Sequence, residues 1–202
     1  MKDDKSILQK SSDFVSEFFE ANLPEWAVYH NLHHTKETVD GCLEIGKGSN
    51  LTEEDLEIIC IAAWFHDIGY IYTAEGHEEK SAEISSKFLK SNDYLPQKIN
   101  KVTECIIATK ITNVPKNLLE FVLCDSDLIS LGRPDYFEKN DLLKLEIEKR
   151  SGKKINDEQW LRRSIKFLSS HKYYTNYSNL NFYPQLRKNL RVLQKQLDEI
   201  VA

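Results

Sequence analysis

The sequence predicts an all-α fold, a single-domain helical bundle of about nine helices. Glycine and proline are few, 7 and 5 among 202 residues, and apolar residues recur at helical spacing along almost the whole chain. A hydrophobic content of 41% beside a charged content of 29% is typical of a globular domain with a sizeable core. No internal repeat or long linker divides the sequence, so we expect one domain over residues 1–202.

Turn and cap residues mark the ends of the expected helices. Gly46 and Gly48 end the second helix, and Thr52 before three acidic residues has the pattern of an N-cap with a capping box. Pro115 precedes another helix, and the aromatic, Asn-rich segment 173–179 is expected as a loop. We expect helices over about residues 6–20, 35–45, 52–67, 77–91, 96–109, 116–131, 134–151, 157–169 and 183–201.

An apolar run that begins at Ile58 ends with a histidine and an aspartate side by side, His66 and Asp67. Burying an ionised carboxylate without a partner is costly, so a cation or hydrogen-bond donors must lie nearby. Adjacent side chains on a helix diverge by about 100°, so the two can converge on one ion only where the helix ends. Gly69 supports such an end. The alternative is a hydrogen-bonded core pair without an ion.

Further histidines and aspartates supply a possible partner. His30, His33 and His34 form one group, and Asp125 and Asp127 follow another apolar run. Two imidazoles and two carboxylates suit Mn, Fe, Co, Zn or Mg, whereas the four cysteines form no close pair and suit core positions. The sequence therefore favours a mixed nitrogen and oxygen site for a divalent metal.

The ordered motifs resemble the HD-domain superfamily of metal-dependent phosphohydrolases. The resemblance rests on H-N-L-H-H-T, on the doublet in W-F-H-D-I-G-Y and on D-S-D-L, and Y-H-N-L-H-H is similar to the version in cyclic-nucleotide phosphodiesterases. The motifs H-E-E-K-S-A, A-T-K and D-S-D-L-I-S-L-G look most like those of small bacterial predicted HD phosphohydrolases. The resemblance covers about residues 29–132, the expected metal-site core, and we expect the helices of 134–202 to pack on it.

The resemblance implies roles for individual residues. Asp127 is preferred to Asp125 because the family ligand is the aspartate directly followed by leucine, and His30 is the implied general acid. Asp67 could bridge two ions, because each of its oxygens can serve one. A divalent ion, one or two in number, would activate water for attack on phosphorus. The implied metal ligands are His34, His66, Asp67 and Asp127.

Five further residues are candidates with competing interpretations. Lys80, Lys110 and Arg133 are candidates for binding the substrate phosphate, although isolated basic residues on a helix are commonly solvated surface charges. His77 could touch a second metal or the substrate, or simply begin a helix in water. Glu78 could orient the attacking water, although the helix dipole already favours acidic residues in a first turn.

We expect a metal-dependent phosphohydrolase acting on a nucleotide or a related phosphomonoester or phosphodiester. A non-catalytic nucleotide-sensing module would keep the same ligands and stays open. A di-iron oxygenase of the HD type needs further histidines, and only His77 lies between the doublet and Asp127.

Composition also bounds the partners and the location. A small phosphorylated molecule is the expected substrate, and a homodimer is possible. The net charge of −5 argues against nucleic-acid binding. No stretch has the length of a membrane span, and M-K-D-D-K-S has no apolar leader after it, so we expect a cytoplasmic protein.

Overall fold

The computed structural model describes residues 5–201, which form ten α-helices, two short 3₁₀ helices and no strand. The predicted all-α class is therefore confirmed. The expectation of no leader partly concerns residues 1–4, which lie outside this range. The α-helices are α1 Ile7–Asn22, α2 Leu32–Gly48, α3 Glu53–Phe65, α4 His77–Ser91, α5 Pro96–Ala108, α6 Leu118–Asp127, α7 Tyr136–Ser151, α8 Asp157–Ser170, α9 Asn176–Asn181 and α10 Tyr183–Val201. The 3₁₀ helices are η1 Ile68–Ile71 and η2 Ile129–Gly132.

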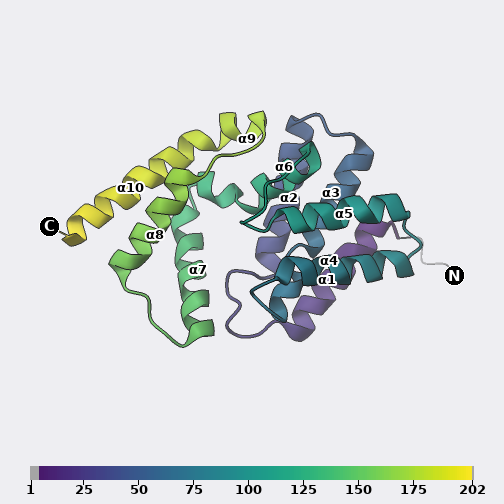
Figure 1. Ribbon diagram of the computed structural model, residues 1–202, viewed down its shortest axis with the longest axis horizontal. Coiled ribbons are helices and arrows are strands. Elements are labelled where there is room, and N and C mark those ends of the chain that lie inside the picture. The colour runs from purple at the N-terminus through teal and green to yellow at the C-terminus, as the bar shows by residue number, and fades with distance from the viewer. Residues whose placement is uncertain (1–4, 202) are drawn as a thin grey trace.

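The helices form two groups, α1–α6 on one side and α7–α10 on the other (Figure 1). Helix α3 is the centre of the first group and packs against α1, α2, α4, α5 and α6. Its residues from Ile58 to Ala63 are all fully buried, which explains why this stretch of sequence is apolar without a polar face. The apolar run therefore places the end of α3 deep inside the molecule.

Side-chain caps define where several helices begin. The Thr52 hydroxyl accepts from the amide of Asp55 at 3.1 Å, as its sequence pattern predicts. Asn31, Asn117 and Asn156 accept from the first amides of α2, α6 and α8 in the same way. Gly152 ends α7 with a left-handed φ of 68°, a conformation that glycine adopts without steric cost.

Two expected elements differ in the structure. The helix expected over 116–131 ends at Asp127, and a separate 3₁₀ turn follows it. The segment expected as a loop over 173–179 contains the start of α9, whose N-cap Thr175 accepts from the amide of Ser178 at 3.1 Å. The buried carboxylate of Asp125 holds the amide of Thr175 from 50 residues away, a contact that the local sequence does not reveal.

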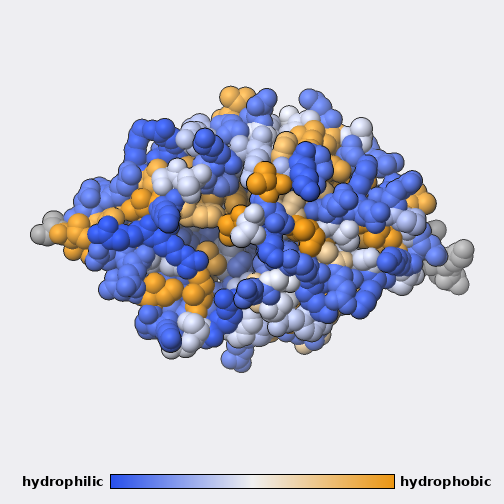
Figure 2. All heavy atoms as spheres, in the orientation of Figure 1, coloured by the Kyte–Doolittle hydropathy of each residue, from blue (hydrophilic) through white to orange (hydrophobic). Residues whose placement is uncertain are grey.

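The face of the molecule shown in Figure 2 is largely polar. Figure 2 shows that hydrophilic residues cover most of the viewed face and that apolar residues appear in small separate groups. The four cysteines are buried, in agreement with the expected core positions. None of the described helices combines the length and the hydropathy needed to cross a membrane.

Candidate metal centre

The start of α2 positions the first histidine. The Asn31 side chain accepts from the amides of His33 and His34, at 2.8 and 3.2 Å, which fixes the first turn of the helix. His34 points inward and is buried, whereas the His33 side chain is exposed and lies 3.3 Å from Glu37. Only one residue of this neighbouring pair can therefore reach the interior.

The end of α3 positions the doublet. The helix stops at Phe65, His66 caps it, and Asp67 has left helical geometry with φ −107° and ψ 1°. Both side chains are buried, and His66 Nε2 lies 3.1 Å from Asp67 Oδ2. The prediction that the doublet sits where a helix ends is confirmed, and this end allows both side chains to face the same space.

Four side chains from three helix ends converge. His34 Nε2 lies 3.4 Å from Asp67 Oδ2 and 3.1 Å from Asp127 Oδ1. His66 Nε2 lies 3.5 Å from the same Asp127 oxygen. The possible ligand atoms of His34, His66 and Asp127 all lie within 4.8 Å of one another, close enough to share one ion. The structure thus brings together the four residues that the resemblance implies as ligands.

Unpartnered atoms in this cluster fit a cation. His66 Nδ1 donates to the carbonyl of Ala63 at 2.7 Å, so its Nε2 presents a lone pair to the cluster. This Nε2 and Asp67 Oδ2 are both buried without a hydrogen-bond partner. Buried polar atoms are normally paired, and a divalent ion would satisfy both. The donor set therefore fits a metal on grounds independent of the resemblance.

The charges of the cluster support the same conclusion. Burial alone would lower the pKa of His34, but the hydrogen bond to Asp127 and the nearby charges of Asp127 and Asp67 outweigh it and raise the pKa to about 9. The pKa of Asp127 is lowered despite burial, because His34 and His66 favour its charged form. Without a metal, the raised pKa values of His34 and His66 mean that two protonated imidazoles balance the two carboxylates. A divalent cation carries the same charge as these two protons and would replace them.

His77 and Glu78 lie on the other side of Asp67. His77 Nδ1 lies 2.9 Å from the carbonyl of Ala74, while its Nε2 lies 3.4 Å from Asp67 Oδ1. Glu78 Oε2 is buried without a hydrogen-bond partner, 3.4 Å from His77 Nδ1. Asp67 therefore has one oxygen toward His34 and His66 and the other toward His77, the geometry of a carboxylate that can serve two ions.

His30 stands at the edge of the cluster and is held by a residue of α7. Its Nδ1 contacts Glu146 Oε1, and Glu146 Oε2 accepts from the amides of Tyr29 and His30 at 2.8 and 2.9 Å. The His30 ring centroid lies 5.9 Å from that of His34 and 6.5 Å from that of His77. Since Nδ1 is engaged, Nε2 is the nitrogen left for a ligand.

The two aspartates near the end of α6 have different surroundings. Asp125 is fully buried and accepts from the amides of Tyr174 and Thr175 at 2.8 and 2.9 Å and from the Thr175 hydroxyl at 2.8 Å. Asp127 instead faces His34 and His66. Of the two, only Asp127 is placed where a ligand of the shared ion would be.

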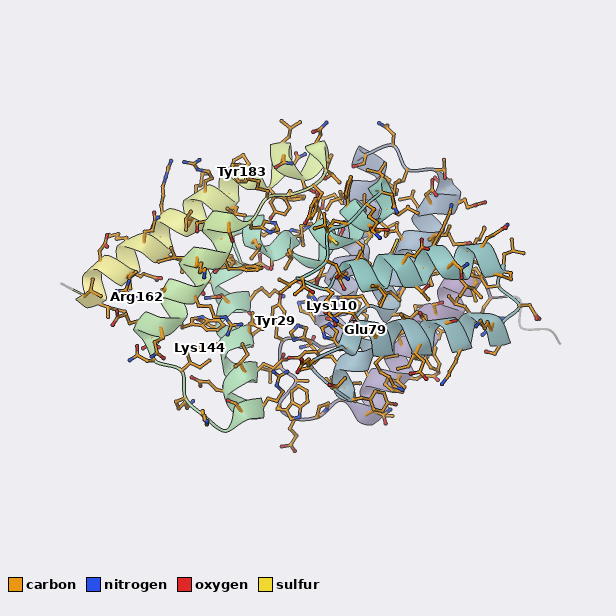
Figure 3. The ribbon with its side chains drawn as sticks, viewed as in Figure 1. Tyr29, Glu79, Lys110, Lys144, Arg162 and Tyr183 are labelled. Carbon is orange, nitrogen blue, oxygen red and sulfur yellow. The ribbon has the colours of Figure 1, made fainter. Side chains whose placement is uncertain are left out.

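The three basic candidates each form an ion pair. Lys80 pairs with Glu83 at 2.9 Å, and Arg133 pairs with Glu44 at 3.1 Å. Lys110 pairs with Glu79 at 2.5 Å, close to the first turn of α4, and both lie near the junction between the two helix groups (Figure 3). No direct contact joins these lysines or Arg133 to the four clustered side chains in the described part of the chain.

A narrow pocket of about 10 Å³ lies beside His34 and Asp127. Its wall includes Arg133 and also Lys139, a nearly buried lysine of α7 whose ammonium lies 2.8 and 2.7 Å from the two oxygens of Glu37. Of the three basic candidates, only Arg133 lines this space.

Sequence reasoning missed the contribution of α7. Lys139, Glu146 and Arg150 of this helix contact α2, the segment before α2 and η1. Their spacing of seven and four residues puts them along one face of α7, and this polar stripe is the only sequence signal that could have found them. In a helix rich in lysine and glutamate such a stripe resembles an ordinary solvated face.

The HD domain model matches residues 31–131, and the chain therefore belongs to the HD-domain family. No curated protein matches this chain. A predicted HD superfamily hydrolase from an uncultured Thermotogales bacterium is similar over 95% of this chain and 92% of its own, with 18% identity and a TM-score of 0.64. A Lactobacillus plantarum protein is similar over 96% and 94%, with 15% identity and a TM-score of 0.67. These likenesses extend the shared fold through α7–α10.

Proposed function

We propose that this HD-domain protein is a metal-dependent phosphohydrolase that acts on the phosphate ester of a small molecule, a nucleotide or a related phosphomonoester or phosphodiester. The observation that carries the proposal is the convergence of two imidazoles and two carboxylates whose buried atoms Nε2 of His66 and Oδ2 of Asp67 have no partner in the protein. The hydrolase description of the Thermotogales neighbour supports the same class of reaction.

Each residue of the cluster has a role in this proposal. His34, His66, Asp67 and Asp127 would hold a divalent ion, Mn, Mg, Fe, Co or Zn, and Asp67 and His77 would bind a second ion or the substrate. The bound metal supplies a Lewis acid that activates water and offsets charge on the phosphoryl oxygens. Glu78, with its unpartnered oxygen beside His77, orients the attacking water.

His30 donates the proton that the leaving oxygen needs. Glu146 fixes the Nδ1 side of the imidazole, so the proton leaves from Nε2 on the opposite side of the ring. The pKa of Glu146 is lowered although burial opposes this, because His30 and the two backbone amides favour the carboxylate. Glu146 therefore stays ionised and continues to orient His30 during turnover.

Metal-loaded protein and a panel of phosphate esters test this function. We expect metal-dependent release of phosphate or nucleoside, and we expect Asp67→Ala to lower it by ~100-fold or more because the ion loses a ligand. Asp40→Ala is the matched control, since Asp40 is an exposed aspartate of α2. A protein that binds metal and nucleotide tightly but releases no product over hours would be a nucleotide sensor instead.

A further inference from the structure

Tyr70 closes the motif W-F-H-D-I-G-Y, and none of the roles assigned above uses it. Its side chain is buried in η1, and its ring stacks on the imidazole of His30 with centroids 4.1 Å apart and an interplanar angle of 27°. Trp26 contacts the same ring edge-on at 5.7 Å. The imidazole of His30 is thus covered on one face by an aromatic ring and held at Nδ1 by Glu146.

The hydroxyl of Tyr70 is also held on two sides. Arg150 Nη1 donates to it at 2.7 Å, and the guanidinium lies over the rings of Tyr70 and Trp26 at 5.5 and 6.0 Å. Burial and the negative charge of Glu146 raise the pKa of Tyr70, with Arg150 opposing, so the hydroxyl stays protonated.

These contacts form one continuous chain. Arg150 donates to the Tyr70 hydroxyl, the Tyr70 ring stacks on the His30 imidazole, and Glu146 holds His30 Nδ1. Arg150 and Glu146 stand one helical turn apart on α7, so a single helix provides two of the four members of the chain. Networks of this kind limit the motion of the side chain that they enclose.

We propose that Tyr70 and Arg150 are positioning residues that hold the His30 imidazole at the angle required to protonate the leaving oxygen. This inference rests on the proposed function. Neither residue touches the substrate: Tyr70 acts by stacking on the ring, and Arg150 acts by fixing the Tyr70 hydroxyl. The helix α7, outside residues 31–131, is therefore part of the active site rather than only a covering element.

A comparison of leaving groups tests the inference in the metal-loaded protein. 4-Nitrophenolate leaves without a proton, whereas butoxide must be protonated by a general acid. The 4-nitrophenyl and n-butyl esters of whichever class of phosphate the protein hydrolyses therefore separate attack on phosphorus from protonation of the leaving oxygen. We expect Arg150→Met and Tyr70→Ala to lose ~10-fold or more on the butyl ester and less than ~3-fold on the nitrophenyl ester. Tyr70→Phe and Arg150→Lys should hydrolyse the butyl ester at rates between those of these variants and that of the wild type.

Lys149→Met is the matched control, because Lys149 is exposed like its neighbour Arg150 but contacts the carbonyl of Glu25, at 3.4 Å, instead of Tyr70. Its ratio of the two rates should equal that of the wild type. We expect His30→Ala to lose rate mainly on the butyl ester. If it does, while Arg150→Met and Tyr70→Phe lose rate equally on both esters, the inference is overturned. Hydrolysis of neither ester by the wild type would overturn the proposed function and this inference with it.

A readout that does not depend on turnover is the exchange of the His30 Nδ1 proton, observed by NMR in metal-free protein. We expect a slowly exchanging proton in the wild type and in Lys149→Met, with exchange on the order of tenfold faster in Arg150→Met because the chain to Glu146 is broken. Unchanged exchange in Arg150→Met would contradict the positioning role. Thermal unfolding of each variant confirms that the protein being compared is folded.

Discussion

Two aspartates of α6 stand two residues apart and face opposite sides of the helix, since residues at this spacing diverge by about 200°. Asp125 accepts three hydrogen bonds from the segment before α9, and Asp127 faces the imidazoles of His34 and His66. Asp125 therefore joins α6 to the segment before α9, whereas Asp127, two positions later, is placed with the candidate metal ligands.

Replacing each aspartate by alanine in turn should affect different properties, the stability of the fold for Asp125 and metal binding for Asp127. Asp125→Ala leaves buried donors of Tyr174 and Thr175 without an acceptor, so we expect a loss of about 2–5 kcal/mol in the free energy of unfolding with metal content retained. Asp127→Ala should lose metal with a smaller loss of stability. Denaturant titration and elemental analysis measure both quantities, and loss of metal from a stable Asp125→Ala protein would contradict these assignments.

At the residue scale, the sequence predicts the doublet well and its distant partners poorly. His66 and Asp67 are recognisable in the sequence because an apolar run ends in two polar residues. Both side chains can face one buried space only where the helix ends. Glu146 gives no such signal, because it is one glutamate in a highly charged helix 116 residues from His30. Long-range pairing of polar groups depends on the tertiary fold, which local spacing does not encode.

The turn between α3 and α4 depends on a close approach at Gly69. Its amide donates to the Ser81 hydroxyl at 2.9 Å, and a Cβ at this position would lie 2.3 Å from the carbonyl oxygen of His77 and 2.7 Å from the amide nitrogen of Ser81. Both atoms belong to the backbone of α4 and cannot rotate away. The glycine therefore sets the distance between the doublet and His77.

Gly69→Ala should move α4 away from η1. We expect a loss of about 1–3 kcal/mol in the free energy of unfolding, together with weaker metal binding, because His77 shifts relative to Asp67. Gly152→Ala serves as the control: a Cβ there meets nothing within 4 Å, and only the left-handed φ costs about 1 kcal/mol. Identical metal affinities in the two variants would show that Gly69 does not position the site.

Helix starts are predictable where the cap is local, as at Thr52, because the side chain and the amide that it accepts are three residues apart. The helix α9 also has a local cap, Thr175 with Ser178, but it is a single short helix in an aromatic, Asn-rich segment, and Asp125 on another helix holds the amide of Thr175 in place. The division of the expected helix 116–131 into α6 and η2 has the same origin, since the end of α6 at Asp127 is held by contacts with His34 and His66.

At the scale of the whole molecule, the candidate metal ligands lie between helices of the first group, and Glu146 of α7 contacts His30 at their edge. Figure 1 shows α7 beside the first group. The match over residues 31–131 covers the four clustered residues but not α7. The all-α class, the order of the motifs and the packing of 134–202 on the core were expected from the sequence, whereas the residues through which α7 contacts the first group were not.

The free energy of unfolding of the metal-free protein, prepared with a chelator, should fall as the pH rises. The pKa of His34 is about 9 in the folded state and about 6.5 in an unfolded chain, so its stabilising contribution is complete below pH ~6.5 and is lost between there and pH ~9. The expected loss is on the order of 3 kcal/mol in the free energy of unfolding, measured by denaturant titration at several pH values. Metal should reverse this trend, because ligand imidazoles must be neutral.

The variant His34→Gln provides the comparison for this pH dependence. Its stability without metal should fall less over the same range, because one titrating imidazole is gone while His66 and His77, whose pKa values are also raised by Asp67, remain. Added metal should change the stability of this variant little. A wild-type protein whose metal-free stability rises between pH 6.5 and 9 would show that His34 is not paired with the two carboxylates.

The most direct test of the metal centre is a crystal structure of the zinc-soaked protein with anomalous data at the zinc edge. We predict an anomalous peak about 2.0–2.2 Å from Nε2 of His34 and of His66, with carboxylate oxygens of Asp67 and Asp127 completing the coordination. The peak should be absent from Asp67→Ala crystals. A cluster that excludes the ion at saturating zinc, with His66 Nε2 bound to another protein group, would contradict the proposed site.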